Sequence, residues 1–328
     1  MTSSHPLVSS ETWPPPTSEY WKVIGSSAGL RTINIQLRGQ EAPLLRIPKD
    51  ALQMGKRLNP LLQIASITSW RMGVKKPNLQ FSLQIHDEDP GAKTLRFDAA
   101  LNDSTVLLPD PYALGSHGYY LIRESIQHIP LPAWRERIPI AFWRGSSTGS
   151  KAITVKRISN NLRIRLCDLS RQYPTELDAR ITDIVQCRDQ DAKEELTELL
   201  RARGMLSRRI DVREFCKYQY LIEIDGNVNS WGLLWKLMTG CCILRVASRR
   251  RQWYHHSLKD YENIVPVAED LSDLHKQLDW CRTHPNESEE IGRNGQLLAM
   301  QVVRNLGKSV LLAIDEFFEN EVSKVTQR

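Results

Sequence analysis

Residues 218–246 read YQYLIEIDGNVNSWGLLWKLMTGCCILRV, and the fold of the second half of the chain can be worked out from this stretch. Its first part, 218–224, is mostly apolar and predicts a strand. Residues 230–239 predict a helix, with Asn229 or Ser230 as its N-cap and Gly240 at its C-terminal end. A second apolar strand follows. Strand, helix and strand in this order predict a βαβ unit and therefore a parallel sheet.

The same alternation extends along the chain in both directions. Further strands are predicted at 138–144, 181–185, 243–246 and 264–267. Helices are predicted over a run that ends near 169, over 192–203, from the turn at 270–273 onward, and over two C-terminal stretches that break near Gly307. Strands that alternate with helices predict a doubly wound α/β domain. We place it at 136–305 and expect a C-terminal helix at 306–328.

The first part of the chain has a different pattern. Residues 1–16 end in three prolines and predict a flexible lead. Apolar and polar residues then alternate over 32–37 and 81–86, and a short apolar run follows at 105–108. These runs predict strands with irregular connections. We therefore expect a separate N-terminal α/β domain at 17–135.

The composition excludes several classes of protein. The chain has 328 residues, of which 41% are hydrophobic and 25% charged, so it is neither disordered nor a low-complexity chain. Its six cysteines form no C-x-x-C pair, and a reducing compartment fits them best. The net charge of +6 is spread evenly rather than gathered in a basic arm. A dedicated nucleic-acid-binding protein is therefore not expected.

We expect neither a membrane-spanning stretch nor a secretory signal in this sequence. Its longest apolar-rich stretch, 233–246, is interrupted by Lys236 and Arg245 and is shorter than the roughly 20 residues that cross a bilayer. The N-terminus has no basic segment followed by an apolar core. We expect a cytoplasmic protein, with peripheral attachment at the inner membrane as an option.

Two turns that follow strands are suited to binding an anion. The first runs from a predicted strand through Arg144, Gly145, Ser146, Ser147, Thr148 and Gly149. Glycine lets a phosphate approach the backbone, free amides at a helix start bind it, and Arg144 would add a forked cation. This turn lacks the spacing of a Walker loop, and taken alone it is more simply explained as a plain tight turn with a surface arginine.

The second turn consists of Asp225, Gly226, Asn229, Ser230 and Trp231. In open α/β sheets, ligands bind beyond the carboxyl ends of the strands, where such loops lie. The helix N-terminus would suit a diphosphate, and Trp231 could border a base. An ordinary connecting loop with a helix cap and a packed tryptophan is the alternative interpretation.

Two further clusters each allow several interpretations. His86, Asp87, Glu88 and Asp89 follow a predicted strand. They can be a solvated turn, a D-x-D metal site formed by Asp87 and Asp89, or a turn that carries a general base. The second cluster, at 249–256, interleaves three arginines with Trp253, Tyr254 and two histidines. Such a cluster occurs in single-strand grooves, in sugar or pyrophosphate sites, and at solvated helix starts.

Taken together, these segments resemble glycosyltransferase family 90, the capsule-associated and Rumi-like sugar transferases. The resemblance extends over about residues 80–300 and is strongest over 139–280. It is carried by several motifs in one order: residues 141–149, Cys216-Lys217-Tyr218, Ile224-Asp225-Gly226, Ser230-Trp231, Gly240 with Ile243-Leu244, Trp253-Tyr254, residues 265–267, residues 270–274 and Trp280. Several motifs in order are far more specific than any one of them.

The resemblance implies a GT-B-like fold, with two Rossmann-like domains facing a cleft and additional C-terminal helices. A nucleotide-sugar, most simply a UDP-sugar, would bind the C-terminal domain at the two turns. Studied members of the family invert the anomeric centre and use an aspartate after an N-terminal strand as the base, which corresponds to Asp87. The arginine of the R-G-S turn corresponds to Arg144. Two cations of the family pattern are missing, because this chain has Ser147 and Gly232 at those positions.

We therefore predict a hexosyl- or pentosyltransferase that moves a sugar from a UDP-sugar to a hydroxyl of a glycan, a lipopolysaccharide or other lipid-linked acceptor, or a protein. Arg144, Lys151, Lys236 or Arg245 would have to supply the missing positive charge. No metal cofactor is required, because arginine and helix amides can stabilise the leaving group, although Mn²⁺ or Mg²⁺ would act if the D-x-D interpretation held. The alternatives are a catalytically degenerate family member and a protein that binds a polyanion, either nucleic acid or an acidic glycan.

Overall fold

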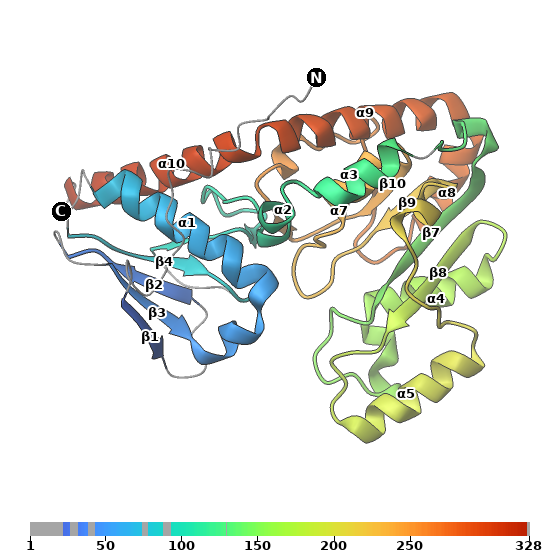
Figure 1. Cartoon of the computed structure of the whole chain (residues 1–328). Coiled ribbons are helices and arrows are strands. Elements are labelled where there is room, and N and C mark those ends of the chain that lie inside the picture. Colours follow the sequence, from blue (N-terminus) through green and yellow to red (C-terminus); the bar gives the residue numbers. More distant parts are fainter. Residues whose placement is uncertain are drawn as a thin grey trace. The chain divides into compact units, whose positions relative to one another are not determined.

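The computed structural model describes residues 22–26, 32–38, 43–73, 78–87, 93–128 and 130–326 (Figure 1). They belong to two compact units. The N-terminal unit comprises Met1–Tyr119, Arg250–Trp253 and Val303–Arg328, and the C-terminal unit comprises Tyr120–Arg249 and Tyr254–Val302. The C-terminal unit thus begins earlier than the predicted residue 136, and the last helix belongs to the N-terminal unit. The predicted flexible lead lies outside the described residues.

The C-terminal unit contains the parallel sheet that the sequence predicts. Its five strands lie in the order β12-β10-β9-β7-β8, and every neighbouring pair is parallel. The strands are β7 (Ile138–Ser146), β8 (Leu177–Asp183), β9 (Tyr218–Glu223), β10 (Cys242–Val246) and β12 (Val265–Val267). The chain runs from β7 outward to β8 and then returns past β7 to β9. The direction of strand addition therefore reverses between β7 and β9.

Helices connect these strands and also precede and follow them, and those at Tyr120–Gln127 and Val212–Phe215 were not predicted. The helices are α3 (Tyr120–Gln127), α4 (Leu162–Gln172), α5 (Gln190–Ala202), α6 (Val212–Phe215), α7 (Leu233–Met238), α8 (Leu274–Thr283) and α9 (Pro285–Arg304). Short 3-10 turns lie at Trp134–Glu136, Val155–Asn160 and His255–Ser257. The C-terminal glycine of α7, Gly240, has a φ of +69°, a left-handed conformation that glycine adopts without strain.

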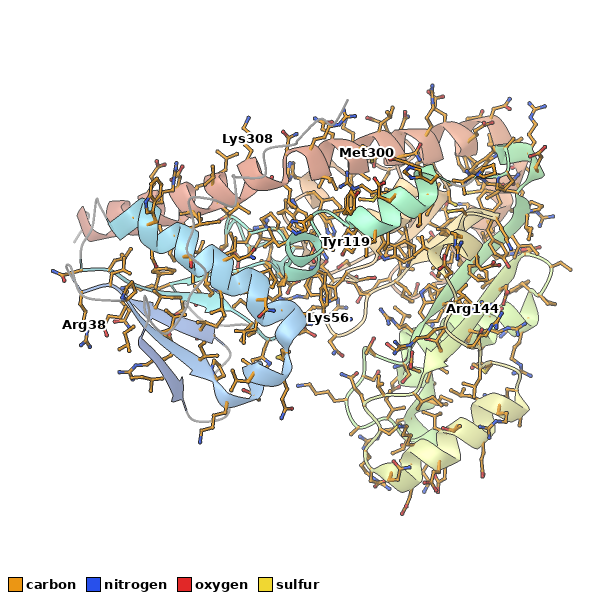
Figure 2. The ribbon with its side chains drawn as sticks, in the orientation of Figure 1. Arg38, Lys56, Tyr119, Arg144, Met300 and Lys308 are labelled. Carbon is orange, nitrogen blue, oxygen red and sulfur yellow. The ribbon has the colours of Figure 1, made fainter. Side chains whose placement is uncertain are left out.

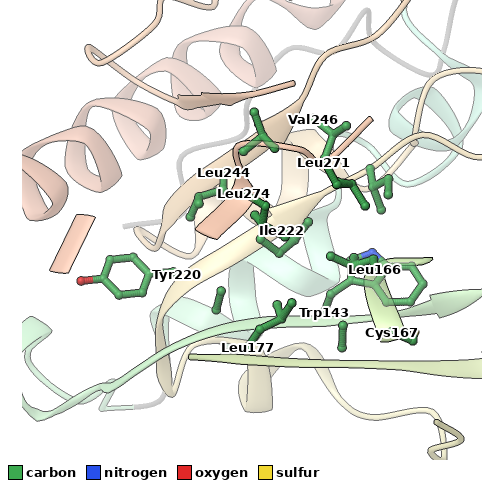
Figure 3. Packing of buried hydrophobic residues seen from close by; sticks show 14 of the residues in the cluster. Trp143, Leu166, Cys167, Leu177, Tyr220, Ile222, Leu244, Val246, Leu271 and Leu274 are labelled. Atoms are coloured by element: carbon green, nitrogen blue, oxygen red, sulfur yellow. The ribbon is translucent and has the colours of Figure 1, made fainter. Parts of the chain in front are cut away.

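Apolar side chains from the strands and helices of the C-terminal unit form one core (Figure 3). Trp143 and Tyr220 are among its largest fully buried members, and Ile222 and Leu244 are completely inaccessible. Figure 3 shows Leu271 and Leu274, which precede and begin α8, among the same side chains. Burying each such side chain contributes about 1.5–3 kcal/mol, so this packing holds the carboxyl ends of the strands in place.

The N-terminal unit contains a mixed sheet, which differs from the predicted second Rossmann-like domain. Its strand order is β1-β3-β2-β4-β5. Its strands are β1 (Lys22–Ser26), β2 (Thr32–Gln36), β3 (Leu44–Pro48), β4 (Gln80–Gln84) and β5 (Thr94–Leu95). β2 is antiparallel to both β3 and β4, whereas β1 and β3 are parallel. The connection from β2 to β3 is too short for the crossover that a parallel pair needs.

Helix α1 (Gly55–Gly73) connects β3 to β4 after a 3-10 turn at Lys49–Gln53, and α2 is Pro111–Gly115. The run at 105–108, predicted to be a strand, makes only a single bridge, between Arg96 and Leu107. Residues 250–253 return to this unit, where β11 (Arg250–Arg251) pairs with β6 (Ala99–Ala100).

The C-terminal helix α10 (Leu306–Thr326) packs against the N-terminal unit. The Phe318 ring meets Phe81 of β4 edge-on at 5.6 Å, and Ala313 and Ile314 are fully buried. Within the described residues, no single helix is long and apolar enough to cross a bilayer. The broken pair Pro285–Arg304 and Leu306–Glu319 meets those limits only jointly, as core helices of other proteins also do.

Candidate functional site

The two predicted turns follow β7 and β9, the neighbouring strands between which the order of strand addition reverses. Ligands of open α/β sheets bind beyond the carboxyl ends of the strands at this switch point. The residues that the sequence placed in two separate motifs therefore lie at one edge of one sheet. This edge of the C-terminal unit is the candidate donor site.

The two loops touch each other through their glycines. Gly149 has a φ of +113°, and its N–H donates to Asn227 Oδ1 at 3.2 Å. A Cβ on Gly226 would lie 2.7 Å from Thr148 Oγ1, and a Cβ on Gly149 would lie 3.3 Å from the Gly226 carbonyl oxygen. Both positions therefore need glycine because the loops pass so close together.

Gly145, near the end of β7, and Ser147, just after it, shape the first loop. A Cβ on Gly145 would lie 2.6 Å from the Trp143 ring, so a side chain there would push against the core. The fully buried Ser147 exchanges hydrogen bonds with Val185: its hydroxyl donates to the carbonyl and accepts from the N–H, both at 2.9 Å. Ser146 and Thr148 place their hydroxyls 3.4 Å apart beside it. Ser147 thus anchors the loop to the end of the neighbouring strand.

Arg163, which the sequence analysis did not single out, joins the two loops. From the first turn of α4 its guanidinium donates to four oxygens: the carbonyls of Ser146, Ile224 and Asp225 at 2.9–3.1 Å, and Thr148 Oγ1 at 2.7 Å. Burial lowers the pKa of Arg163. The only sequence signal was a basic residue early in the helix after the glycine turn, and local spacing cannot show which carbonyls it reaches.

Asp225 shapes the second loop from within. Its carboxylate accepts from the Ser230 N–H at 3.1 Å and from the Ser248 hydroxyl. Burial raises the pKa of Asp225, although these hydrogen bonds and the nearby charge of Arg245 act in the opposite direction. Asp225 therefore organises this edge of the sheet, and Arg245 is one of the charges that act on it.

The helix after this loop begins later than predicted. α7 starts at Leu233, and its N-cap is Gly232, which provides no side-chain cap. Neither Asn229 nor Ser230 caps it: Asn229 is buried, and the Ser230 hydroxyl accepts from the Gly232 N–H at 3.3 Å within the loop. Trp231 is half-buried in the same turn. With only six residues, α7 is too short to provide the predicted anion-binding helix start.

Arg144 lies on β7 (Figure 2). Its guanidinium is bound by groups outside the two loops. Nη2 lies 2.7 Å from Asp178 Oδ2, and Nη1 donates to the carbonyls of Trp143 and Asp178 at 2.8 Å. The group also stacks over the Phe142 ring at 4.2 Å. Binding a diphosphate as predicted would require the ion pair with Asp178 to open, so these contacts do not support that role.

The remaining candidate cations differ in their surroundings. Lys236 is buried, with Nζ 2.5 Å from Glu223 Oε2 and 3.0 Å from the Ile222 carbonyl oxygen. Lys151 is exposed in the loop after β7. Arg245 is half-buried in β10, beside β9, and Nη2 lies 3.3 Å from His255 Nδ1. Among the four cations considered, which include Arg144, Arg245 lies at the carboxyl edge of the sheet and also near the second loop.

The predicted base, Asp87, belongs to the N-terminal unit, where it lies just beyond β4. Its Oδ1 is 2.7 Å from Nη1 of Arg57. Glu88 and Asp89 lie outside the described residues. The predicted D-x-D pair of Asp87 and Asp89 is therefore described only at Asp87. In the part of the chain that the structure describes, no group of three or more His, Cys, Asp or Glu side chains is arranged to hold a metal ion.

The basic and aromatic cluster at 249–256 is not an exposed groove. Arg250 pairs with the buried Asp98, and Arg251 donates to the carbonyl oxygens of Asp103 and Thr105. Trp253 and Tyr254 are buried. Arg250 and Arg251 thus hold the β11 segment in the N-terminal unit, whereas Arg249 and His256 of the same cluster are exposed.

Comparisons with known proteins agree with this description. The model of Glycosyl transferase family 90 matches residues 118–307, which include both loops and all five strands of the parallel sheet. Asp87 lies upstream of the matched residues. Protein O-glucosyltransferase 2 of Danio rerio is 26% identical over 195 residues, which cover 60% of this chain and 35% of that protein.

Protein O-glucosyltransferase 3 of Homo sapiens is 27% identical over 180 residues, which cover 55% of this chain and 31% of that protein. The matches thus span about a third of each relative. The crystal structure of Anabaena Alr3699/HepE in complex with UDP-glucose has a weak likeness, with a TM-score of 0.38 and 13% identity over 63% of this chain and 53% of that one. Because the family model covers more than half of its residues, the chain belongs to glycosyltransferase family 90.

Proposed function

We propose that this protein transfers a sugar from a UDP-sugar to an acceptor hydroxyl. Its membership of family 90 carries this proposal. The protein O-glucosyltransferases among its relatives support glucose as the first sugar to test. The acceptor is proposed to be a glycan, a lipid-linked saccharide such as lipopolysaccharide or a capsule precursor, or a protein. Location in the cytoplasm and contact with a membrane stay sequence-based predictions.

We propose that the donor binds at the carboxyl edge of the parallel sheet, between the loops that follow β7 and β9. This edge is the switch point of the sheet, and Arg163 holds the two loops together. A UDP leaving group carries negative charge that a cation must stabilise as the bond to the sugar breaks. Arg245 is our candidate for that cation, because Arg144 and Lys236 are engaged by Asp178 and Glu223.

Replacing Arg245 with alanine is expected to weaken UDP binding by about 10–100-fold, the usual worth of a hydrogen bond to a charged group. Calorimetry with UDP and with uridine distinguishes phosphate binding from a structural role of Arg245. Uridine has no phosphate, so it should bind the unaltered protein and Arg245→Ala alike. Arg249→Ala is the matched control, since Arg249 is an exposed arginine that pairs with Glu269. Equal losses for UDP and uridine would show that Arg245 only supports the fold.

The proposed reaction inverts the sugar's anomeric centre. The acceptor oxygen attacks C1, the bond from C1 to the diphosphate oxygen breaks, and UDP leaves with the electron pair. Asp87 accepts the proton of the acceptor hydroxyl. The GT-B arrangement predicted from the sequence, with the base in one domain and the donor in the other, is part of this proposal.

A thermal-shift screen of the whole chain against UDP, GDP, CMP and their sugars tests the proposal. A ligand at 100 times its Kd stabilises a protein by about 2.7 kcal/mol, so UDP and UDP-glucose should raise Tm clearly. Release of UDP from UDP-glucose should then be measurable, and EDTA should not abolish it. No shift with any nucleotide would contradict the proposal and favour a degenerate family member. Loss of activity in EDTA with recovery in Mn²⁺ would revive the D-x-D interpretation.

A further inference from the structure

The two carboxylate oxygens of Asp87 have different surroundings. Oδ1 is shielded from solvent and accepts no regular hydrogen bond, but it forms an ion pair with Arg57 Nη1 at 2.7 Å. The side chain as a whole is still 24% exposed. The exposed area therefore belongs to the other side-chain atoms, of which Oδ2 is the one that can accept a proton.

Arg57 is itself held firmly in place. It lies in the first turn of α1 and is only 8% exposed. Its Nε donates to the Tyr112 hydroxyl at 3.1 Å, Nη1 donates to the Ile85 carbonyl oxygen at 3.2 Å, and the guanidinium lies 5.4 Å from the centre of the Tyr112 ring. Three elements, α1, α2 and the end of β4, thus fix the direction of this guanidinium.

The charge of Arg57 is retained despite its burial. Burial by itself would lower the pKa of Arg57, but the Asp87 carboxylate and the Tyr112 hydroxyl outweigh it and the pKa is raised. A second carboxyl, Asp110, lies nearby and caps α2 by accepting from the N–H groups of Tyr112 and Ala113. Burial raises the pKa of Asp110 to about 7, while the charge of Arg57 acts to lower it. Asp87 is the carboxylate that lies in direct contact with Arg57.

We infer that Arg57 is a positioning residue for the proposed transfer: it binds Oδ1 of Asp87 and so presents Oδ2 to the acceptor hydroxyl. A proton can be transferred well only to an oxygen within hydrogen-bond reach and in a defined direction. A carboxylate just beyond a strand end rotates freely unless one of its oxygens is bound. The inference rests on the proposed function, in which Asp87 is the base.

Arg57→Met and Arg57→Lys in the whole chain test this role. With UDP-glucose as donor and water as acceptor, Arg57→Met should lower kcat by about 10²-fold, the cost of a misplaced catalytic group. Arg57→Lys keeps the charge and should recover part of that loss. The Kd for UDP should stay within about twofold, since a residue that only orients the base makes no contact with the donor.

The matched control is Arg71→Met. Arg71 lies on the same helix and also holds a carboxylate, with Nε and Nη2 each 2.6 Å from an oxygen of Asp315. Its replacement should leave kcat and the UDP Kd unchanged. If Arg71→Met lowers kcat as much as Arg57→Met does, the effect is a general loss of helix packing and the inference fails.

The decisive comparison is made in the Asp87→Asn background. Because Arg57 acts through Asp87, adding Arg57→Met to Asp87→Asn should lower kcat no further. A further 10²-fold loss would overturn the inference. If Arg57→Met does not fold, Tyr112→Phe removes one group that holds Arg57 and should lower kcat several-fold, again only when Asp87 is present.

The two proposals fail in different ways. If the unaltered protein neither binds UDP nor releases it from UDP-glucose, the proposed function fails and the role of Arg57 fails with it. If the unaltered protein is active and Arg57→Met has the same kcat, only the positioning role is contradicted.

Discussion

Replacing Asp87 with asparagine is expected to lower the turnover of UDP-glucose by about 10²–10⁴-fold while leaving UDP binding unchanged. Asparagine has nearly the same shape, but its amide does not accept a proton from the attacking hydroxyl. Initial rates of UDP release at saturating UDP-glucose give kcat, and calorimetry gives the Kd for UDP. We expect kcat to fall and Kd to stay the same, because the donor is proposed to bind in the other unit.

Asp50→Asn is the control for this experiment. Asp50 is a carboxylate of the same unit, is largely exposed, and lies 3.4 Å from the ring of His86, the residue next to Asp87. Its neutralisation should change neither kcat nor Kd. Turnover of Asp87→Asn at the level of the unaltered protein would remove Asp87 from the mechanism and leave the base unassigned.

Replacing Lys236 with methionine is expected to destabilise the protein by about 3–5 kcal/mol, the cost of breaking a buried ion pair by removing one partner. The Lys236 and Glu223 side chains are 6% and 4% exposed, and Glu223 Oε1 is buried without a hydrogen-bond partner. Without Lys236, the buried Glu223 carboxylate would lose its ion-pair partner. Denaturant unfolding at pH 7 should show a lower midpoint with an unchanged slope.

The double variant Glu223→Met with Lys236→Met should recover most of this stability, because apolar residues of similar volume often replace a buried pair at little cost. Lys217→Met provides a surface control. Lys217 pairs with Glu214 at 2.9 Å, but about half of each side chain is exposed, so its loss should cost less than about 1 kcal/mol. If the double variant is as unstable as Lys236→Met alone, apolar residues cannot replace the pair, and the ion pair itself is needed to stabilise the end of β9.

Local sequence patterns predicted the C-terminal unit in most of its detail. Apolar runs located β7, β9, β10 and β12, and glycine marked the end of α7. These features can be predicted from short stretches of sequence, because a buried strand or a helix end depends on residues that are neighbours along the chain. The strand order was not predicted, yet it makes β7 and β9 neighbours and so brings the two loops together.

The N-terminal unit was predicted less well. Helix α1 was missed, although Leu58, Leu61, Ile64, Ala65 and Met72 are buried at helical spacing. Pro60 inside the helix obscured the pattern, since proline ordinarily interrupts one. The mixed sheet was also unexpected, because antiparallel pairing depends on how short each connection is and on which strands it brings together.

The sequence by itself determined the class of the C-terminal fold, the two glycine turns and the family resemblance, because each depends on residues that are neighbours along the chain. Only the tertiary structure decided how the charged side chains are used. It placed Arg144 on Asp178, Lys236 on Glu223, Arg163 across the two loops and Arg57 on Asp87. The reason is that a long basic side chain binds whichever oxygens the fold brings within about 3 Å. Those oxygens come from distant parts of the chain.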